Sequence, residues 1–205
     1  MHLPRIVLAL AVMLALTTTV RQRASADPPT TGEVAGTIVV DVPKHRANTI
    51  VYVKNAGQGT SKATVTMDQK GLVFVPRVLP IQKGTTVSFL NSDSVGHNVF
   101  TPDGDKYDLG TWPQGQTRKY IYKKTGVYRQ LCKVHDDMLA FIVVLDTKYF
   151  TVSNKTGAFK LPPLPPGNYT LGIWHEKLIA DEVTVEVVAG KTKNVEIALK
   201  AKPKS

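Results

Sequence analysis

Short apolar and β-branched runs, separated by Gly, Pro, Asn and Asp, recur along most of the chain. Such runs of four to eight residues, bounded by turn-forming residues, are typical of strands. No segment has a helical pattern of convincing length, so the chain is predicted to be all-β. Strands are expected in EVAGTIVVDV (33–42), NTIVYVKN (48–55), ATVTMD (63–68), TTVSFLN (85–91), HNVFT (97–101), RKYIYK (118–123), GVYRQLC (126–132) and LAFIVVLD (139–146).

One of these segments, LAFIVVL at positions 139–145, is apolar on both alternating faces. A strand with one face in water alternates with polar residues. Both faces are therefore expected to be covered, one by the strand's own core and the other by neighbouring chain. The two halves of the protein are thus predicted to pack together.

The region after position 148 also reads as strands and turns, in FTVSNKTGAFKLPPLPPGNYTLGIWHE and DEVTVEVVAGKTKNVEIALK. Residues 154–157 are expected to form a hairpin turn and residues 162–167 a rigid corner. Closely spaced short strands throughout the chain favour β-sandwiches or barrels.

Residues 1–26 have the layout of a cleavable secretory signal, with Arg5, an apolar run and a final Ala-Ser-Ala triplet. The eleven-residue run is shorter than the roughly 20 apolar residues of a membrane-spanning helix. Export to the periplasm or another extracytoplasmic space is predicted, with no membrane span left after cleavage. Removing Arg5, Arg21 and Arg23 lowers 26 basic residues to 23 against 16 acidic ones, a net charge of +7.

The only cysteine, Cys132, begins the pattern C-x2-H-x2-M with His135 and Met138. An exported protein with one cysteine cannot form an internal disulfide. The thiol is free, bridges two chains, binds a metal, or is a small buried apolar side chain. A thiolate, an imidazole and a thioether together favour copper over magnesium or calcium, and a trigonal copper site needs a second histidine. His97, in a loop just before a predicted strand, is the candidate.

The motifs HNVF and GVYRQLCKVHDDM, with the upstream stretch FVPRVLPIQKGTTVSFLNSDSVGHNV, resemble the cupredoxins, the blue copper proteins. The loop length between the ligands is like that of amicyanin. The resemblance covers about residues 63–147 and implies one type 1 copper ion. It implies His97 and His135 as imidazole ligands, Cys132 as the thiolate and Met138 as the axial ligand. Asn98 matches a position that locks the ligand loops near the sulfur.

Three residues near these ligands have their own consequences. Asp136 and Asp137 stand where related proteins carry Pro or apolar residues, which favours Cu(II) and makes the expected docking face less apolar. Gln130, two residues before Cys132, is expected to point inward and to need a hydrogen-bond partner.

The stretch VSNKTGAFKLPPLPPGNYTLGIWHEK resembles the carboxypeptidase-regulatory-like, transthyretin-like sandwich. The matching positions are Gly157, Phe159, Leu161, Pro166, Gly167, Tyr169 and Leu171. Such a module opens with a strand pair like those at 33–42 and 48–55. We therefore expect residues 33–56 and 148–200 to form one sandwich, with a Greek-key cupredoxin inserted in it. In the alternative, the N-terminal strands extend the cupredoxin sheet.

These inferences define four segments: a signal (1–26), a leader with the first strand pair (27–62), a copper-binding domain (63–147), and a second sandwich with a basic tail (148–205). His175 and Glu176 could form a weak second metal site, although a surface pair at a strand end explains them better.

The function that follows is one-electron transfer by copper, with redox proteins as partners. The basic mature chain favours acidic ones. The alternative is a copper-binding module for storage, delivery or sensing, which would favour exposed methionine and histidine clusters that the chain lacks. Neither an enzyme nor a nucleic-acid-binding protein is predicted, because no triad, histidine-rich loop or basic-aromatic module is found. The oligomeric state is left open.

Overall fold

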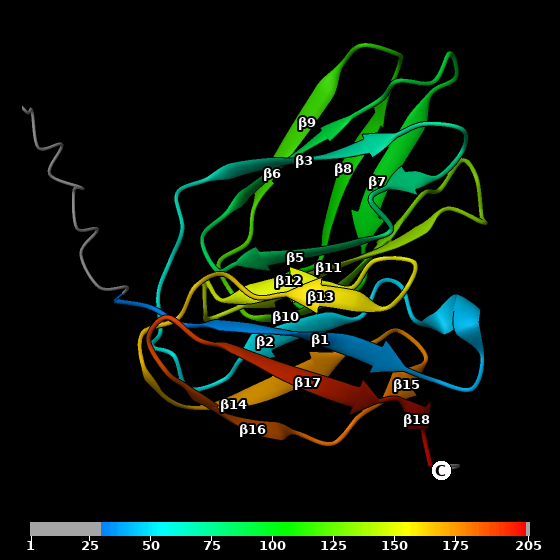
Figure 1. The fold of residues 1–205 in the computed structure, drawn as a ribbon. Helices are drawn as coiled ribbons and strands as arrows, with labels where there is room; N and C mark the ends of the chain where they lie inside the picture. Colours follow the sequence, from blue (N-terminus) through cyan, green and yellow to red (C-terminus); the bar gives the residue numbers. More distant parts are fainter. Residues whose placement is uncertain (1–29, 204–205) are drawn as a thin grey trace, which may run out of the picture.

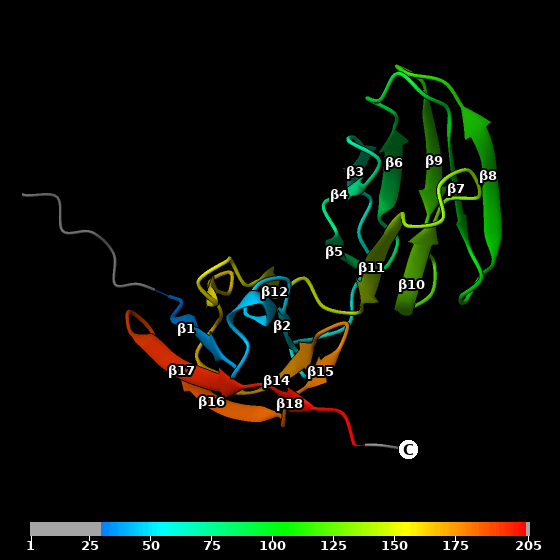
Figure 2. The ribbon, with the colours of Figure 1, turned by 90° about the vertical axis from the view of Figure 1, so that its right-hand side faces the viewer.

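The computed structural model describes residues 30–203, so the predicted signal lies outside the described residues. In the described part, eighteen strands and one short 3-10 helix, η1 (Pro43–His45), are present. The strands form two β-sandwiches, visible as two lobes in Figure 2. This confirms the predicted all-β fold. No helix within residues 30–203 is long and apolar enough to cross a membrane.

The inserted sandwich, strands β3 to β11, lies in the upper part of Figure 1. Its first sheet has the order β5 (Val78–Gln82), β11 (Leu139–Leu145), β10 (Gly126–Leu131), β7 (His97–Thr101) and β8 (Tyr107–Trp112). Its second sheet has the order β4 (Phe74–Val75), β3 (Thr64–Gln69), β6 (Thr86–Leu90) and β9 (Thr117–Ile121). Parallel pairs β5–β11 and β3–β6 occur among antiparallel neighbours, and a single apolar core fills the space between the two sheets.

The split sandwich consists of β1, β2 and β12 to β18. One sheet has the order β13 (Ala158–Lys160), β1 (Glu33–Val39) and β17 (Thr192–Ala198). The other has the order β12 (Phe150–Val152), β2 (Ile50–Val53), β14 (Gly167–Trp174) and β16 (Val183–Val187). A small pair, β15 (Leu178–Ile179) and β18 (Lys200–Ala201), completes it.

The strands that precede the inserted sandwich pair with strands that follow it. β1 lies between β13 and β17, and β2 lies between β12 and β14. β1 and β2 themselves belong to different sheets, and neither extends a sheet of the inserted sandwich. The split sandwich is therefore assembled from two distant pieces of chain, with β3 to β11 between its second and third strands.

The turn at residues 154–157 closes locally as predicted, with the Gly157 N–H donating to the Asn154 carbonyl and the Asn154 N–H donating to the Ala158 carbonyl. The strands on either side of it, β12 and β13, nevertheless join different sheets. The Asn154 side-chain oxygen accepts the backbone N–H groups of Thr156 and Ala158, which closes the turn. Side-chain capping of this kind shapes the turn locally whether or not the flanking strands pair. Here the turn carries the chain from one sheet to the other.

β8 was not among the expected strands, since Asp108 and Gly110 are poor strand formers and the strand lies at a sheet edge.

Each sandwich also has a tyrosine whose hydroxyl donates to the backbone carbonyl four residues earlier. Tyr128 bonds to Lys124 and Tyr169 bonds to Pro165, both at 3.0 Å. This corner contact is known from Greek-key sandwiches, where it fixes the entry into a strand.

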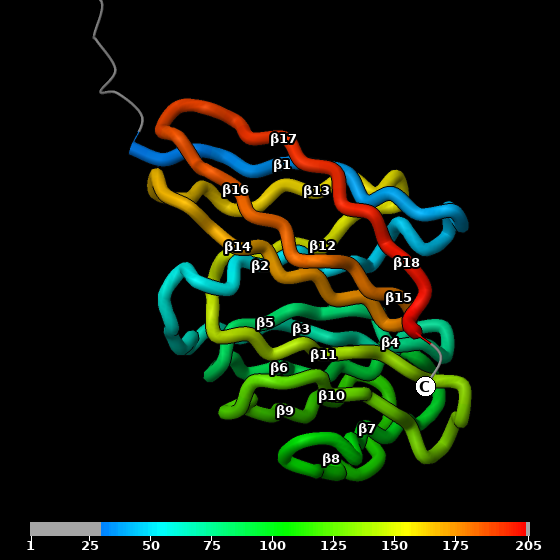
Figure 3. Tube along the Cα trace, turned by 90° about the horizontal axis from the view of Figure 1, so that it is seen from below, coloured from blue at the N-terminus to red at the C-terminus, as the bar shows by residue number. Residues whose placement is uncertain are grey.

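β11 contributes to two apolar clusters, as its two-faced pattern predicted. Ala140, Ile142 and Val144 lie in the core of the inserted sandwich, while Val143 and Leu145 lie in a cluster between the sandwiches. The other members of that interface cluster come from both sandwiches: Ile50, Tyr52, Val78, Phe141, Phe150, Val152 and Trp174. The two halves therefore pack sheet against sheet, and Figure 3 shows β14 and β2 running beside β5 and β11.

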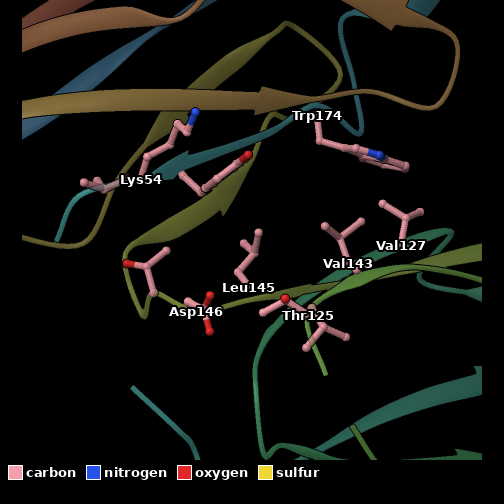
Figure 4. Close-up of a pocket in the computed structure, with 12 residues that line it drawn as sticks. Lys54, Thr125, Val127, Val143, Leu145, Asp146 and Trp174 are labelled. Atoms are coloured by element: carbon pink, nitrogen blue, oxygen red, sulfur yellow. The ribbon is translucent and has the colours of Figure 1, made fainter. Parts of the chain in front are cut away.

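A groove of about 310 Å³ opens at the side of this interface. Figure 4 shows Lys54 and Asp146 toward one end of it and Trp174 and Val127 toward the other. None of the predicted copper ligands lines the groove. It is a gap between two packed sheets and is separate from the chemistry described below.

Leu145→Ala tests the packing of the sandwiches against each other. Removing a buried leucine side chain costs about 2–5 kcal/mol. We expect a loss of about 2 kcal/mol in the free energy of unfolding, at the low end because the adjacent groove lets the site relax. Urea unfolding followed by the fluorescence of Trp112 and Trp174, one in each sandwich, measures it. Val188→Ala, at an exposed valine, serves as control, and equal stabilities of the two variants would contradict the prediction.

Candidate metal centre

The predicted ligands occupy the ends of three neighbouring strands. His97 is the first residue of β7, Cys132 directly follows β10, and Met138 directly precedes β11. His135 lies in the loop between β10 and β11. Because β10 pairs antiparallel with both β7 and β11, the start of β7, the end of β10 and the start of β11 meet at one edge of the sheet.

Three of the four predicted ligands converge. One ligand atom each of His97, Cys132 and His135 lies within 4.8 Å of the others. The Cys132 Sγ is 3.9 Å from the His135 Nδ1, and the centroids of the His97 and His135 rings are 4.7 Å apart. His97 and Cys132 are buried, whereas His135 is half-buried. The arrangement is a preformed cluster of three possible ligands with one imidazole at its edge.

His97 leaves one ring nitrogen without a partner. Its ring is fully buried, and its Nε2 is 2.9 Å from a carboxylate oxygen of Asp93. Its Nδ1 is buried with no hydrogen-bond partner among the described residues. An unpaired buried nitrogen costs free energy, so such a group in a folded protein requires an explanation. A bound metal ion supplies it, since a ligating histidine commonly holds a carboxylate with its other ring nitrogen.

Asp93 is itself fixed by the chain on its other side. Its two carboxylate oxygens accept the backbone N–H groups of Gly71 and Leu72 at 2.7 and 2.9 Å. These backbone hydrogen bonds, that of Leu72 first, lower the pKa of Asp93 to about 2. This residue is not predicted from the sequence, where its only signal is a carboxylate four positions before His97.

Asn98 connects the ligand loops. Its backbone N–H points to the Cys132 Sγ at 3.4 Å, and its side-chain oxygen accepts the N–H of Lys133 at 3.3 Å. Its side-chain nitrogen donates to Asp108 and to the Gly110 carbonyl on β8. One amide therefore links β7, the cysteine loop and β8. Asp108 was also missed by the sequence analysis, since its strand was not expected.

Met138 lies in the same buried cluster as Cys132 and is only 1% exposed. Its backbone N–H donates to the His135 carbonyl at 3.2 Å, closing a turn in the loop. The methionine side chain is thus held in the apolar core beneath the loop. Its role as a ligand belongs to the proposal below.

Gln130 points inward and has partners for both ends of its amide. Its oxygen accepts the hydroxyl of Tyr107, and its nitrogen donates to the Tyr128 carbonyl. The hydroxyl of Tyr107 also meets that of Tyr122, and Tyr120 and Tyr128 pack against the Tyr122 ring. Burial raises the pKa of Tyr107 and Tyr122. This network satisfies the side-chain polar atoms of Gln130, Tyr107 and Tyr122 inside the core.

His175 and Glu176 do not form an exposed pair. His175 is 5% exposed, and its Nδ1 accepts the backbone N–H groups of Lys177 and Leu178. Glu176 binds Arg77 of the other sandwich at 2.7 Å. The expectation of a surface pair is corrected, because the end of β14 faces the inserted sandwich and not the solvent.

The family comparison agrees with this geometry. Residues 61–145 match the family model of copper binding proteins, plastocyanin/azurin family. This segment is a cupredoxin domain. Its cofactor is copper, which the thiolate and imidazole donors and the unpaired His97 nitrogen suit.

A second family model, polysaccharide lyase family 4, domain II, matches residues 134–195. It covers β11 and most of the split sandwich beyond the cupredoxin, but neither β1 nor β2. The split sandwich is thus an additional β-sandwich that the chain carries beside its cupredoxin domain.

Solved structures similar to part of the chain include three copper proteins. A reduced mutant of amicyanin is 17% identical, covering 46% of this chain and 98% of its own, with a TM-score of 0.39. A purple cupredoxin from Nitrosopumilus maritimus is 22% identical, covering 40% and 99%, with a TM-score of 0.37. A copper-containing nitrite reductase from Thermus scotoductus SA-01 is 23% identical, covering 54% and 28%, with a TM-score of 0.39. No curated protein matches the chain.

Asp93→Ala tests the support of His97. Without the carboxylate, the imidazole loses the partner that orients it and makes it more basic. We expect the affinity for Cu(II) to fall about 10- to 100-fold, measured by competition with a chelator. Asp103→Ala is the matched control, because Asp103 is also hydrogen-bonded but pairs with Arg129 on the surface. If both variants kept the wild-type affinity, Asp93 would have no part in the site.

Asp108→Asn tests the clamp on Asn98. The hydrogen bond from Lys133, with those from Gly110 and Asn98, lowers the pKa of Asp108 from 3.8 to about 2. A lowered carboxylate pKa contributes stability above the unfolded value that is lost as the pH falls through the folded value. We therefore expect the variant to lose less stability than the wild type between about pH 4 and pH 2. Urea unfolding of both proteins across this pH range measures the effect. An equal fall in the free energy of unfolding of the two proteins would contradict the proposed role of the Asp108 carboxylate in holding Asn98.

Proposed function

We propose that the protein is an exported one-electron carrier whose type 1 copper ion is held by His97, Cys132, His135 and Met138. The observation that carries the proposal is the convergence of two imidazoles and the thiolate at one end of the cupredoxin domain. Bound there, copper supplies the Cu(I)/Cu(II) couple. The side chains of the protein hold the ligands in one geometry, so that little rearrangement accompanies the change of charge.

The burial of the ligands supports a carrier over a storage or delivery module. His97, Cys132 and Met138 are 0%, 5% and 1% exposed, and each lies at the end of a paired strand or directly next to it. Proteins that exchange metal readily need ligands that incoming and outgoing partners can reach. Here only His135 is partly open, which suits the passage of an electron better than the passage of an ion.

The surroundings of His135 support electron exchange with another protein. Exposed apolar side chains lie on the segments that meet at the site, each at least 44% exposed: Leu72, Val73, Val75, Val95 and Val134. Val134 neighbours His135, and Val95 lies between Asp93 and His97. Asp136 and Asp137 are exposed beside them, so the face is mixed but keeps an apolar part, which is typical of an interaction surface.

The partners proposed are redox proteins of the extracytoplasmic space. The expected signal at residues 1–26 places the mature protein there, and its net charge of +7 (23 basic against 16 acidic residues) favours an acidic partner. An electron-transfer complex of this kind is expected to be short-lived, since such interfaces are small.

Two substitutions of proposed ligands test whether the protein holds the copper site of an electron carrier. In the mature chain loaded with copper, Cys132→Ser is expected to abolish the intense thiolate-to-copper absorption. Met138→Gln is expected to retain copper with a lower reduction potential, because an oxygen donor favours Cu(II) more than a thioether does. Visible and paramagnetic resonance spectra and a redox titration measure these effects.

Met67 offers a matched control for the methionine substitution, since it is equally buried in the same core. Met67→Leu should leave spectrum and potential unchanged. If the reduction potential of Met138→Gln equalled that of the wild type, Met138 would not be the axial ligand. A colourless wild-type protein that releases copper readily would instead favour storage or delivery.

A further inference from the structure

Arg77 connects the two sandwiches at the copper end of the inserted one. Its Nη2 lies 2.7 Å from the Glu176 Oε2, and its Nη1 donates to the Leu139 carbonyl at 3.1 Å. The guanidinium lies 5.9 Å from the Phe141 ring, which packs against Trp174 of the split sandwich. One side chain is thus in contact with both units.

The Leu139 carbonyl is the first backbone acceptor after Met138. The parallel pairing of β11 with β5 begins at Phe141 and Val78, the first residue of β5, so no residue of β5 lies opposite Leu139. The N–H of Phe141 bonds to the Arg77 carbonyl at 2.8 Å, and the Arg77 side chain then supplies the next hydrogen bond along the strand. Arg77 therefore continues the hydrogen bonding along β11 by one more bond, toward the loop that carries His135 and Met138.

Glu176 is held in place by its own sandwich. It follows β14, in a turn whose backbone N–H groups at Lys177 and Leu178 bond to the buried His175 ring. The side chain of Glu176 is 16% exposed, against 42% for that of Arg77. Planar guanidinium groups can bind a carboxylate and a carbonyl together, which a lysine cannot do with the same geometry. The orientation of Arg77 thus depends on the split sandwich.

We propose that the split sandwich positions Met138 through Glu176, Arg77 and the Leu139 carbonyl. The inference deepens the proposed function, since it rests on Met138 being the axial ligand. An axial thioether is bound weakly and at long range, so the protein more than the metal determines where it lies. Glu176 and Arg77 are positioning residues, and the second sandwich gains a role in tuning the copper site.

The test uses the signals of the methionine methyl groups in the mature chain. After removal of residues 1–26, only Met67 and Met138 remain, so a sample labelled at the methionine methyl carbon gives two resonances. In Glu176→Ala we expect the Met138 resonance to shift or broaden, while that of Met67 stays in place as an internal reference. This measurement on the copper-free protein does not depend on electron transfer.

Glu182→Ala is the matched control, because Glu182 is also a glutamate of the split sandwich but pairs with Lys54 of the same sandwich. It should move neither resonance. Arg77→Lys keeps the positive charge beside Glu176 but cannot also hold the Leu139 carbonyl, and it should move the Met138 resonance as Glu176→Ala does. In the copper-loaded forms, the same two variants should change the relative intensity of the thiolate-to-copper bands.

An unmoved Met138 resonance in Glu176→Ala and Arg77→Lys would overturn the inference, whatever the copper does. A shifted resonance with an unchanged copper spectrum would show that the contact moves Met138 but that Met138 is not a ligand, which refutes the axial assignment. Equal shifts in Glu182→Ala would mean that any charge change on the split sandwich acts at a distance, which also contradicts the proposed contact.

Discussion

The burial of β11 on both faces is the constraint on which the rest of the structure depends. Ala140, Ile142 and Val144 fill the core of the cupredoxin, and Val143 and Leu145 fill the interface with the split sandwich. A strand enclosed in this way cannot slip by one residue without exchanging its two faces. The register of β11 therefore determines where Met138 and Leu139, the residues that precede Ala140, lie relative to the two apolar clusters.

The metal centre is built by hydrogen bonds that converge on its ligands from outside. Asp93 joins His97 to the backbone at Gly71 and Leu72, and Asn98 joins the cysteine loop to β8. These contacts use backbone groups, the buried Asn98 amide and the half-buried Asp93 carboxylate, each held by more than one hydrogen bond. The ligand atoms are thus held before a metal arrives, which is what a copper site that works in two charge states requires.

The split sandwich gives the cupredoxin a rigid neighbour on the side away from solvent. It covers the outer face of β5 and β11, while His135 and the exposed apolar residues near it remain open. The proposed electron exchange and the packing against the split sandwich thus use different faces of one small domain. Through Arg77, the supported face also reaches the carbonyl that follows Met138.

The sequence by itself determined the all-β fold, the two-faced strand and the residue types of the copper site, because alternation and ligand chemistry are local properties. It indicated that strands before and after the cupredoxin belong together, but only pairing across more than 100 residues decides which strands are neighbours. Asp93, Asp108 and Arg77 were not recognisable, since carboxylates and arginines are common and their roles arise from what the fold brings near them. The turn at 154–157 was recognisable, but not that its flanking strands join different sheets. Side-chain capping makes the turn, whereas the tertiary structure decides which sheet each flanking strand joins.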